Sequence, residues 1–311
     1  MNNSLDKCVI IGGSGEMGSM FASLLNNESK EVSIIDIAPS PIPNVTFLNS
    51  NILNLCENAS TLITTADLVI LTLPESIAIK TVENVTNLMN ENSLLIHTLS
   101  VQESMYNELS KLDLSIEVAG INPKFSPNLG IEGRPVAVIN QIGRYRLSSF
   151  IDLLKSWGAE VVFMDADEHD KLASILQALT HASIFTFGLA LMNMKVDIEK
   201  LNTLATPPFA TMMGLLARLG SGNTEVYWDI QNANKNAELS REKLIEAAKL
   251  FKNSTDNKLI FKENQNLITE AIGRDLEPLN SFCSELFMND IYIKSKKGNE
   301  NYDKYQSEVK A

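Results

Sequence analysis

A glycine-rich loop is the first group of residues in this chain that could do chemistry. It follows the apolar run Cys8–Ile11 and precedes a helix-like segment that begins near Met17. In that context the spacing Gly-x-Gly-x-x-Gly is typical of a dinucleotide-binding loop with the pyrophosphate at the helix N-terminus. We expect a tight turn at the first glycine, close backbone approach to the pyrophosphate at the second, and close packing of helix on strand at the third. The predicted contacts are Gly13, Ser14, Gly15, Glu16, Met17 and Gly18.

Asp36 is predicted to determine which nucleotide cofactor binds. It ends the second apolar run, 18 residues after Gly18, where its carboxylate can accept hydrogen bonds from both adenosine ribose hydroxyls and would repel a 2′-phosphate. Residues 37–41 contain no Arg or Lys that would bind such a phosphate. The sequence therefore predicts NAD rather than NADP. The other predicted cofactor contacts are Leu73, Pro74 and Ser100.

A second group of polar residues is centred on the loop Ile121–Pro127, which reads Ile-Asn-Pro-Lys-Phe-Ser-Pro. Asn122 can hold a substrate by hydrogen bonds but cannot take a proton near neutral pH. Arg218, on a predicted helix, offers the two-pronged fork that binds carboxylates, and an exposed helix charge is the alternative.

The 3 histidines of the chain are the obvious candidates for a base. His169 lies at the start of a predicted helix after three acidic residues, which favours a structural or capping role. His181 lies within an apolar helix, where a core or interface position is usual and a role in shaping a site is the alternative. His97 precedes the loop that we expect beside the nicotinamide.

The first half of the chain alternates apolar runs of strand length with periodic segments of helix length. This alternation predicts an α/β fold with a parallel, doubly wound sheet of Rossmann type. The predicted strands are Lys7–Ile11, Val32–Ile37, Leu68–Leu73, Leu94–Thr98, Glu117–Gly120, Val136–Asn140 and Glu160–Met164. The predicted helices between them are Met17–Leu25, Ile77–Met89 and Leu147–Trp157.

From Asp165 onward the pattern is helical. Asp165 and Asp167 could cap a helix whose stretch Ile175–Met192 is hydrophobic on nearly every face, which favours a dimer interface over a helix buried in its own domain. Further helices are predicted at Leu201–Leu219, Thr224–Phe251 and Leu259–Asn289. The predicted domains are an NAD-binding Rossmann domain (1–165), an all-helical dimerisation and substrate domain (166–293), and a polar disordered tail (294–311).

Composition limits the partners of this 311-residue chain, of which 44% is hydrophobic. The formal net charge of −12 argues against nucleic acid or an anionic membrane, because both require clustered Lys and Arg. No apolar run approaches the roughly 20 residues that span a bilayer. The 3 cysteines have no paired spacing, which suits a reducing compartment, and we predict a cytoplasmic protein.

Several short motifs in a fixed order resemble the prephenate dehydrogenase family, and above all the dehydrogenase half of the bifunctional chorismate mutase/prephenate dehydrogenases. The motifs are Val9–Gly18, the loop at 122–127, Glu168–Asp170, Gln177–His181, Ala217–Leu219 and Glu225–Tyr227. The resemblance implies an NAD-dependent oxidative decarboxylation of a small anionic cyclohexadiene. Hydride leaves C4 for the nicotinamide, the ring carboxylate leaves as carbon dioxide, and the ring becomes aromatic.

The resemblance also implies roles for single residues. The family's loop histidine, which takes the proton of the 4-hydroxyl and is typically worth ~10² to 10⁴ in rate, corresponds to Asn122. Ser100 corresponds to a serine near the nicotinamide and the 4-substituent, and Arg218 to an arginine that grips a substrate carboxylate. The catalytic candidates are Asn122, Ser100 and His181, and the substrate-binding candidates are Arg218, Lys124 and Gln177.

Three departures from the family pattern cluster at the expected site: Asn122 replaces the histidine, Lys124 a methionine, and Gln102 a lysine. An amino group at C4 would explain Asn122, because the nitrogen lone pair stabilises the cation as an iminium without a concerted base, and the amide oxygen can accept an N–H bond. The sequence thus predicts a 4-amino-4-deoxyprephenate dehydrogenase that makes 4-aminophenylpyruvate. Two alternatives stay open: a prephenate or arogenate dehydrogenase with another base such as His97 or His181, and a non-catalytic NAD-binding homologue.

Overall fold

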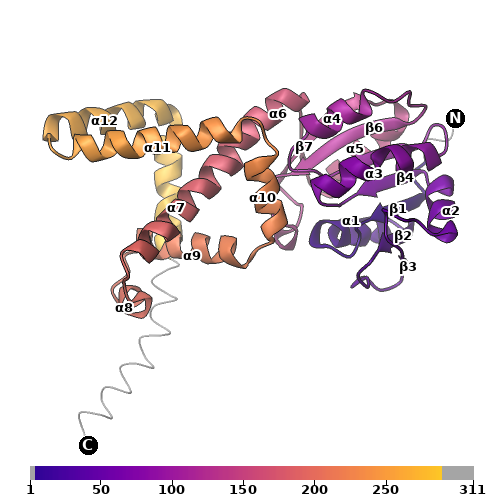
Figure 1. Cartoon of the computed structure of the whole chain (residues 1–311), viewed down its shortest axis with the longest axis horizontal. Helices are drawn as coiled ribbons and strands as arrows, with labels where there is room; N and C mark the ends of the chain where they lie inside the picture. The colour runs from indigo at the N-terminus through magenta and orange to yellow at the C-terminus, as the bar shows by residue number, and fades with distance from the viewer. Residues whose placement is uncertain (1–3, 289–311) are drawn as a thin grey trace, which may run out of the picture. The chain divides into compact units, whose positions relative to one another are not determined.

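The computed structural model describes residues 4–288, and these form two compact units (Figure 1). The first unit contains the chain up to Ala178 together with Thr224–Glu238. The second contains Leu179–Asn223 and the described residues from Leu239 onward. The predicted tail at 294–311 lies outside the described residues.

The first unit is built on an eight-stranded sheet with the order β3-β2-β1-β4-β5-β6-β7-β8. Its strands are β1 (Lys7–Ile11), β2 (Glu31–Asp36), β3 (Thr46–Asn49), β4 (Leu68–Leu71), β5 (Leu94–His97), β6 (Glu117–Pro123), β7 (Pro135–Ile142) and β8 (Glu160–Phe163). The prediction of a parallel sheet is confirmed from β3 to β6, but β7 runs antiparallel to β6. The connection over residues 124–134 is too short for a crossover helix, so the chain returns in the opposite direction.

Helices cover both faces of the sheet, as a doubly wound fold requires (Figure 1). One face carries α1 (Glu16–Asn27) and α5 (Tyr145–Ser156), and the other carries α2 (Glu57–Thr65), α3 (Glu75–Leu88) and α4 (Glu103–Leu109). Successive strand residues point to opposite faces, so Ile10 packs in the core with Phe21 and Phe150, whereas Ile11 packs in the core with Val82.

Three further helical elements belong to the first unit. The helix α6 (Ala166–Ala173) continues into a π-helical segment, η2 (Ser174–Leu179), and α10 (Thr224–Asn232) packs near them. The predicted cap is confirmed, because the Asp165 side chain accepts from Glu168 N at 2.7 Å. Gln231 Nε2 donates to Ala178 O at 2.8 Å and Asn234 Nδ2 donates to Asp170 O at 2.7 Å, which ties the segment around α10 to α6.

The second unit is helical in all of its described elements. They are α7 (Thr180–Asn193), α8 (Ile198–Thr203), α9 (Pro207–Ser221), most of α11 (Ala237–Ser254), α12 (Lys258–Ile272), the 3-10 helix η3 (Gly273–Asp275) and a helix over residues 276–288. Gly188 lets α7 and α9 approach closely, since a Cβ there would meet Leu216 at 2.7 Å. The rings of Phe187 and Phe209 meet edge to face across the same pair of helices, with centroids 6.0 Å apart.

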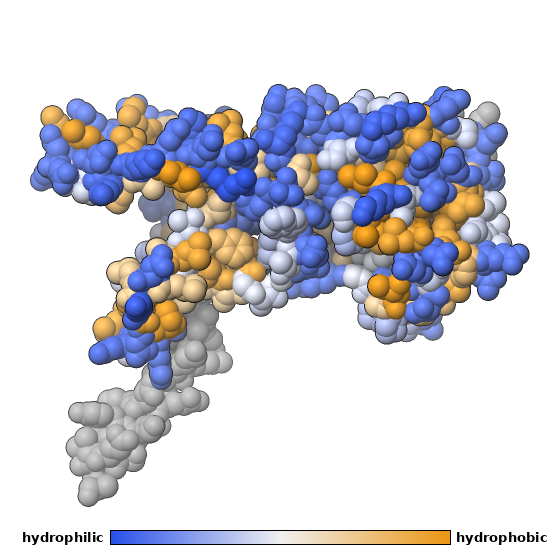
Figure 2. All heavy atoms as spheres, viewed as in Figure 1, coloured by the Kyte–Doolittle hydropathy of each residue, from blue (hydrophilic) through white to orange (hydrophobic). Residues whose placement is uncertain are grey.

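The helices of the second unit expose many apolar side chains, and Figure 2 shows apolar residues on the visible face of α7 and α9. Leu189 is 59% exposed and Met192 73% exposed. By length and composition, one helical stretch of the described chain, Ala166–Asn193, could cross a membrane, which corrects the prediction that no apolar run is long enough.

Candidate active site

The glycine loop forms a tight connection between β1 and α1. Gly12 holds the left-handed turn with φ +83°, and Gly12 N donates to Ile35 O at 2.9 Å. The prediction that Gly13 permits the turn is therefore corrected: Gly13 leaves room for Ile34, whose side chain would lie 2.8 Å from an added Cβ. A Cβ on Gly18 would meet Gly12 O at 2.6 Å, so close packing at Gly18 is confirmed. At Gly15 the nearest heavy atom would be 3.5 Å away, which leaves space for a ligand.

Hydrogen bonds to the loop that it faces fix the orientation of the Asp36 side chain. Its carboxylate accepts from Ser14 N at 2.9 Å through Oδ2 and from Ala38 N at 3.0 Å through Oδ1. Ser14 Oγ donates to Ala38 O at 2.8 Å and ties the two segments together. Each carboxylate oxygen has two acceptor positions, so Asp36 can still bind two ribose hydroxyls in this orientation.

The predicted cofactor residues lie along the edge formed by the carboxyl ends of the parallel strands. The order reverses between β1 and β4, and ligands of open α/β sheets bind at such a switch point. Thr72 N donates to Ile11 O at 2.9 Å, which sets Leu73 and Pro74 beside the glycine loop, and Pro74 directly precedes α3. Ser100 follows β5 at the same edge.

Asn122 and Lys124 stand at the carboxyl end of β6, on that edge. The Asn122 side chain is 4% exposed, and its amide lies 3.1 Å from His169 Nε2. With the amide oxygen toward Lys124 it accepts from Lys124 Nζ at 3.0 Å and donates to Pro123 O at 3.1 Å, which suits a lysine that can only donate when charged. The opposite amide orientation would donate to Ser100 O at 3.3 Å.

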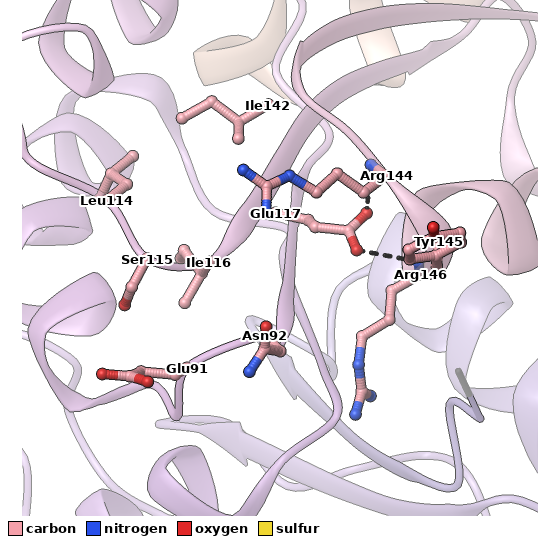
Figure 3. Close-up of a pocket in the computed structure, with 10 residues that line it drawn as sticks. All are labelled: Glu91, Asn92, Leu114, Ser115, Ile116, Glu117, Ile142, Arg144, Tyr145 and Arg146. Atoms are coloured by element: carbon pink, nitrogen blue, oxygen red, sulfur yellow. Dashed lines mark hydrogen bonds between the residues drawn. The ribbon is translucent and has the colours of Figure 1, made fainter. Parts of the chain in front are cut away.

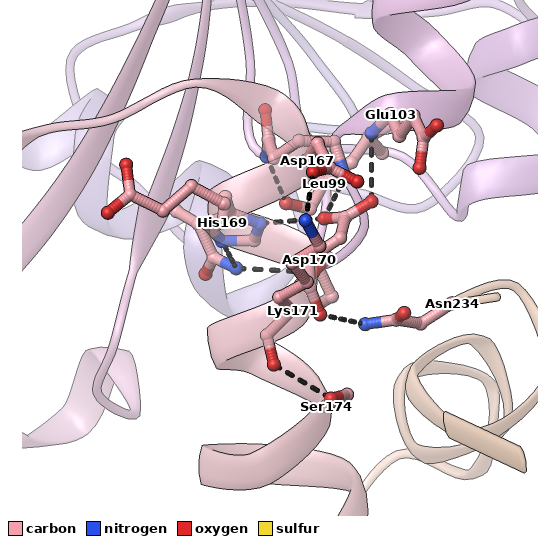
Figure 4. Close-up of polar contacts among 12 residues, drawn as sticks. Leu99, Glu103, Asp167, His169, Asp170, Lys171, Ser174 and Asn234 are labelled. Atoms are coloured by element: carbon pink, nitrogen blue, oxygen red, sulfur yellow. Dashed lines mark hydrogen bonds and ion pairs between the residues drawn. The ribbon is translucent and has the colours of Figure 1, made fainter. Parts of the chain in front are cut away.

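His169 is the residue whose part in this site the sequence prediction missed. Instead of capping a helix, its ring lies with Nδ1 2.7 Å from Asp170 (Figure 4). On its other side, Nε2 lies 2.8 Å from Lys124 Nζ. Lys124 Nζ also donates to Gln177 Oε1 at 3.3 Å. We call Asn122, Lys124, His169, Asp170 and Gln177 the buried polar cluster. The Glu168–Asp170 motif was a signal, but spacing alone could not place it against residue 122.

Asp170 anchors this cluster to the sheet domain. The side chain is 1% exposed and accepts from Gln102 N at 2.9 Å and from Glu103 N at 3.0 Å, at the start of α4 (Figure 4). Since Asp170 accepts the Nδ1 proton, Nε2 of the neutral His169 ring is an acceptor, for Lys124 Nζ or, in the opposite amide orientation, for Asn122 Nδ2 at 3.1 Å. Burial lowers the pKa of His169, against the opposing influence of Asp170, so the neutral form is favoured.

The remaining candidate bases differ in their surroundings. His97 ends β5 and is 2% exposed, and burial lowers its pKa to about 3, which makes it a weak base. His181 lies on α7 and Arg218 on α9, both in the second unit, and their roles in the site stay predictions. Within the first unit the structure therefore brings together Ser100, Asn122, Lys124 and Gln177 of the predicted residues.

A cavity of about 660 Å³ lies at the opposite edge of the same sheet (Figure 3). Glu117 at the amino end of β6 lines it, and its carboxylate accepts from Arg144 N and Leu147 N, at 2.6 and 2.9 Å, at the start of α5. Because these bonds satisfy a helix N-terminus, we assign Glu117 a structural role and exclude this cavity from the candidate active site.

Comparison with known proteins places the chain in a family. The family described as "Prephenate dehydrogenase, dimerization domain" matches residues 165–260. The 4-amino-4-deoxyprephenate dehydrogenase of Streptomyces pristinaespiralis is 36% identical over 239 residues, which cover 76% of this chain and 81% of that protein. The chain belongs to the prephenate dehydrogenase family. The resemblance inferred from the motifs is thereby confirmed.

More distant members of the prephenate dehydrogenase family are similar to this chain over most of its length. The T-protein of Haemophilus influenzae is 25% identical over 86% of this chain, which spans 64% of that protein. The crystal structure of prephenate dehydrogenase from A. aeolicus with hydroxyphenyl propionate and NAD+ matches 93% of the chain with a TM-score of 0.66 at 20% identity. Synechocystis arogenate dehydrogenase matches 88% with a TM-score of 0.61 at 16% identity, so both structures support the predicted fold.

Proposed function

We propose that this member of the family is a 4-amino-4-deoxyprephenate dehydrogenase that uses NAD and releases 4-aminophenylpyruvate and carbon dioxide. The observation that carries the proposal is Asn122, a buried neutral amide where the family pattern has a basic histidine. The 36% identity to a relative of that name supports it independently.

The chemistry of C4 explains why an amide suits this substrate. As hydride leaves a carbon that bears a hydroxyl, the proton of that hydroxyl becomes acidic, and a positioned base lowers the barrier. A carbon that bears a neutral amine differs, because the nitrogen lone pair forms the iminium directly. Asn122 can accept an N–H bond from that amine, whereas an imidazolium at the same place would repel the ammonium form.

The cofactor half of the proposal rests on Asp36 and the glycine loop. Asp36 is aligned by Ser14 N and Ala38 N for ribose hydroxyls, and its charge opposes a 2′-phosphate. Bound NAD would supply the hydride acceptor. The dimerisation-domain match and the exposed apolar helices support a homodimer as the working form.

Initial rates of NADH formation test the proposal with three substrates: 4-amino-4-deoxyprephenate, prephenate and arogenate. We expect kcat/KM to be highest for the amino substrate by tenfold or more, which corresponds to about 1.4 kcal/mol in the transition state. NADP in place of NAD should lower the rate. Faster turnover of prephenate or arogenate would overturn the substrate assignment, and NAD binding without turnover of any of the three would favour a non-catalytic homologue.

A further inference from the structure

Lys124 is the one member of the buried polar cluster that is both titratable and partly exposed. His169 and Asp170 are 0% and 1% exposed, and Asn122 and Gln177 carry neutral amides. Lys124 is therefore the titratable residue of the cluster that a ligand at the carboxyl edge of the sheet can approach without displacing the buried histidine. Of the cluster's titratable groups, only this one can exchange a proton with a substrate directly.

The surroundings of Lys124 suit an amine that changes its charge. Nζ has three acceptors within reach: His169 Nε2 at 2.8 Å, Asn122 Oδ1 at 3.0 Å and Gln177 Oε1 at 3.3 Å. A neutral amine has two N–H donors and a lone pair. The two donors can bond to the two closer acceptors, His169 Nε2 and Asn122 Oδ1, which leaves the lone pair at the third position, where a substrate N–H can take the place of the longer contact to Gln177.

Among residues 4–288, no carboxylate forms an ion pair with the amine that would hold it in the charged form. The titratable groups that face Lys124 are His169, in contact, and Asp170 behind it, whose oxygens are already bonded to His169 and to the start of α4. Burial lowers the pKa of Lys124 to about 8, although the charge of Asp170 opposes this shift. A substantial neutral fraction therefore exists at slightly alkaline pH.

We propose that Lys124 is the catalytic base of this enzyme, which takes a proton from the C4 ammonium of the substrate before hydride leaves. The inference rests on the proposed function, because it needs an amino substrate. One N–H bond of the ammonium breaks and one N–H bond forms on Nζ. The freed lone pair then forms the iminium as hydride departs, and the electron pair of the breaking bond to the carboxylate enters the ring as carbon dioxide leaves.

His169 acts as a positioning residue in this scheme. Its Nδ1 proton is held by Asp170, so Nε2 points an acceptor at Lys124 and orients the amine. Complete burial keeps the ring away from the substrate. The arrangement also explains why Lys124 and Asn122 depart from the family pattern together. The base lies at residue 124 and no longer at residue 122. The amide of Asn122, which stands in place of the family's histidine, becomes one of the acceptors of Lys124.

The competing role for Lys124 is a fixed cation that binds a substrate carboxylate, and two substitutions separate the roles. Lys124→Arg keeps a positive charge and several N–H donors but has no neutral form at accessible pH. Lys124→Met removes both the charge and the base at similar length. If Lys124 is the base, we expect both variants to lose kcat by ~10² or more with the amino substrate. If it is a fixed cation, arginine would restore activity to within about threefold of wild type, which would overturn the inference.

The pH dependence of kcat/KM provides the second readout. The reacting complex pairs neutral Lys124 with the ammonium form of the substrate, so wild-type kcat/KM should rise with pH through about 8 and fall again as the substrate's own amine loses its proton. In Lys124→Met the substrate must lose that proton to solvent, so the residual rate should only rise with pH, through the titration of the substrate's own amine. An unchanged pH profile in Lys124→Met would contradict the inference.

Controls keep this test separate from that of the proposed function. Lys155→Met, at an exposed position of α5, should leave rate and pH profile unchanged. Melting temperatures of all variants show whether the fold is retained. If the wild type does not turn over the amino substrate, the proposed function fails; if it does and Lys124→Arg keeps that activity, only the role of Lys124 fails.

Discussion

Asn122 places a buried neutral amide at the end of β6, where the family pattern has a histidine. The glycine loop, Asp36 and the strand that carries Asn122 lie at the carboxyl edge of a parallel sheet. What changes is the proton chemistry at the end of β6, where a neutral amide and a lysine stand in contact with a buried histidine. Residue 122 offers no base for the proton of a C4 hydroxyl, but its amide can be a hydrogen-bond partner for an amine.

The substitution Asn122→His tests this reading at the scale of one residue. We expect it to raise kcat/KM for prephenate and to lower it for 4-amino-4-deoxyprephenate, because imidazole can take the hydroxyl proton while its charged form repels an ammonium group. The ratio of the two rates, measured with saturating NAD, should change by ~10².

Asn140→His is the matched control, since Asn140 is an exposed residue of β7. It should leave the ratio of the two rates unaltered. If Asn122→His also leaves the ratio unaltered, then residue 122 does not set the substrate, and the choice must lie with other side chains.

At the scale of elements, Asp170 joins α6 to α4 and thereby shapes the site. Replacing it with alanine leaves two buried donors, His169 Nδ1 and Gln102 N, and the partly buried Glu103 N without their acceptor. Removing one partner of a buried charged network costs about 3 to 5 kcal/mol, so Asp170→Ala should lower the free energy of unfolding by about that amount. Denaturant unfolding followed by tryptophan fluorescence measures it, because Trp157 and Trp228 both lie in the first unit.

Asp167→Ala is the comparison for Asp170→Ala, because the same residue type one turn away has a side chain that is 47% exposed and bonds only to exposed lysines. Exposed ion pairs contribute about 0 to 1 kcal/mol, so this variant should unfold nearly as wild type does. Equal losses in the two variants would show that Asp170 does not anchor the cluster.

Much of the element pattern could be predicted, and the failures have physical causes. Buried parallel strands such as Leu68–Leu71 are continuous apolar runs, so they were found from sequence. The short edge strand Thr46–Asn49 and the short helix Glu103–Leu109 carry too few periodic residues to stand out. The predicted helix Leu201–Leu219 divides before Pro207, because proline starts a helix readily but cannot continue one.

The site was predictable only where its residues are close in sequence. Asn122 and Lys124 share a loop, and their departures from the family pattern were visible directly. His169 lies 47 residues from Asn122, and its contact depends on how α6 packs beside β6. A histidine next to Asp170 after acidic residues looks the same in sequence whether it caps a helix or supports a base, so only the fold could separate these roles.

At the scale of the molecule, the apolar surface of the second unit requires a partner. Leu189 and Met192 on α7 are 59% and 73% exposed, in a segment that belongs to a dimerisation-domain family. Large exposed apolar patches mark interaction surfaces in folded proteins. A second copy of the chain is the occupant that the family match favours, and it would bury these side chains.

Leu189→Asp should therefore split the assembly. A carboxylate forced into an apolar interface is costly, so we expect the wild type to have a mass about twice 34.3 kDa by light scattering and the variant to shift toward 34.3 kDa. Leu53→Asp is the control, because Leu53 is similarly exposed, at 56%, but lies in the first unit. If both variants stay dimeric, α7 is not at the interface, and its apolar surface must contact something other than a second copy. If the wild type is itself a monomer, the same surface would need a different partner altogether, and the proposed working form would be wrong.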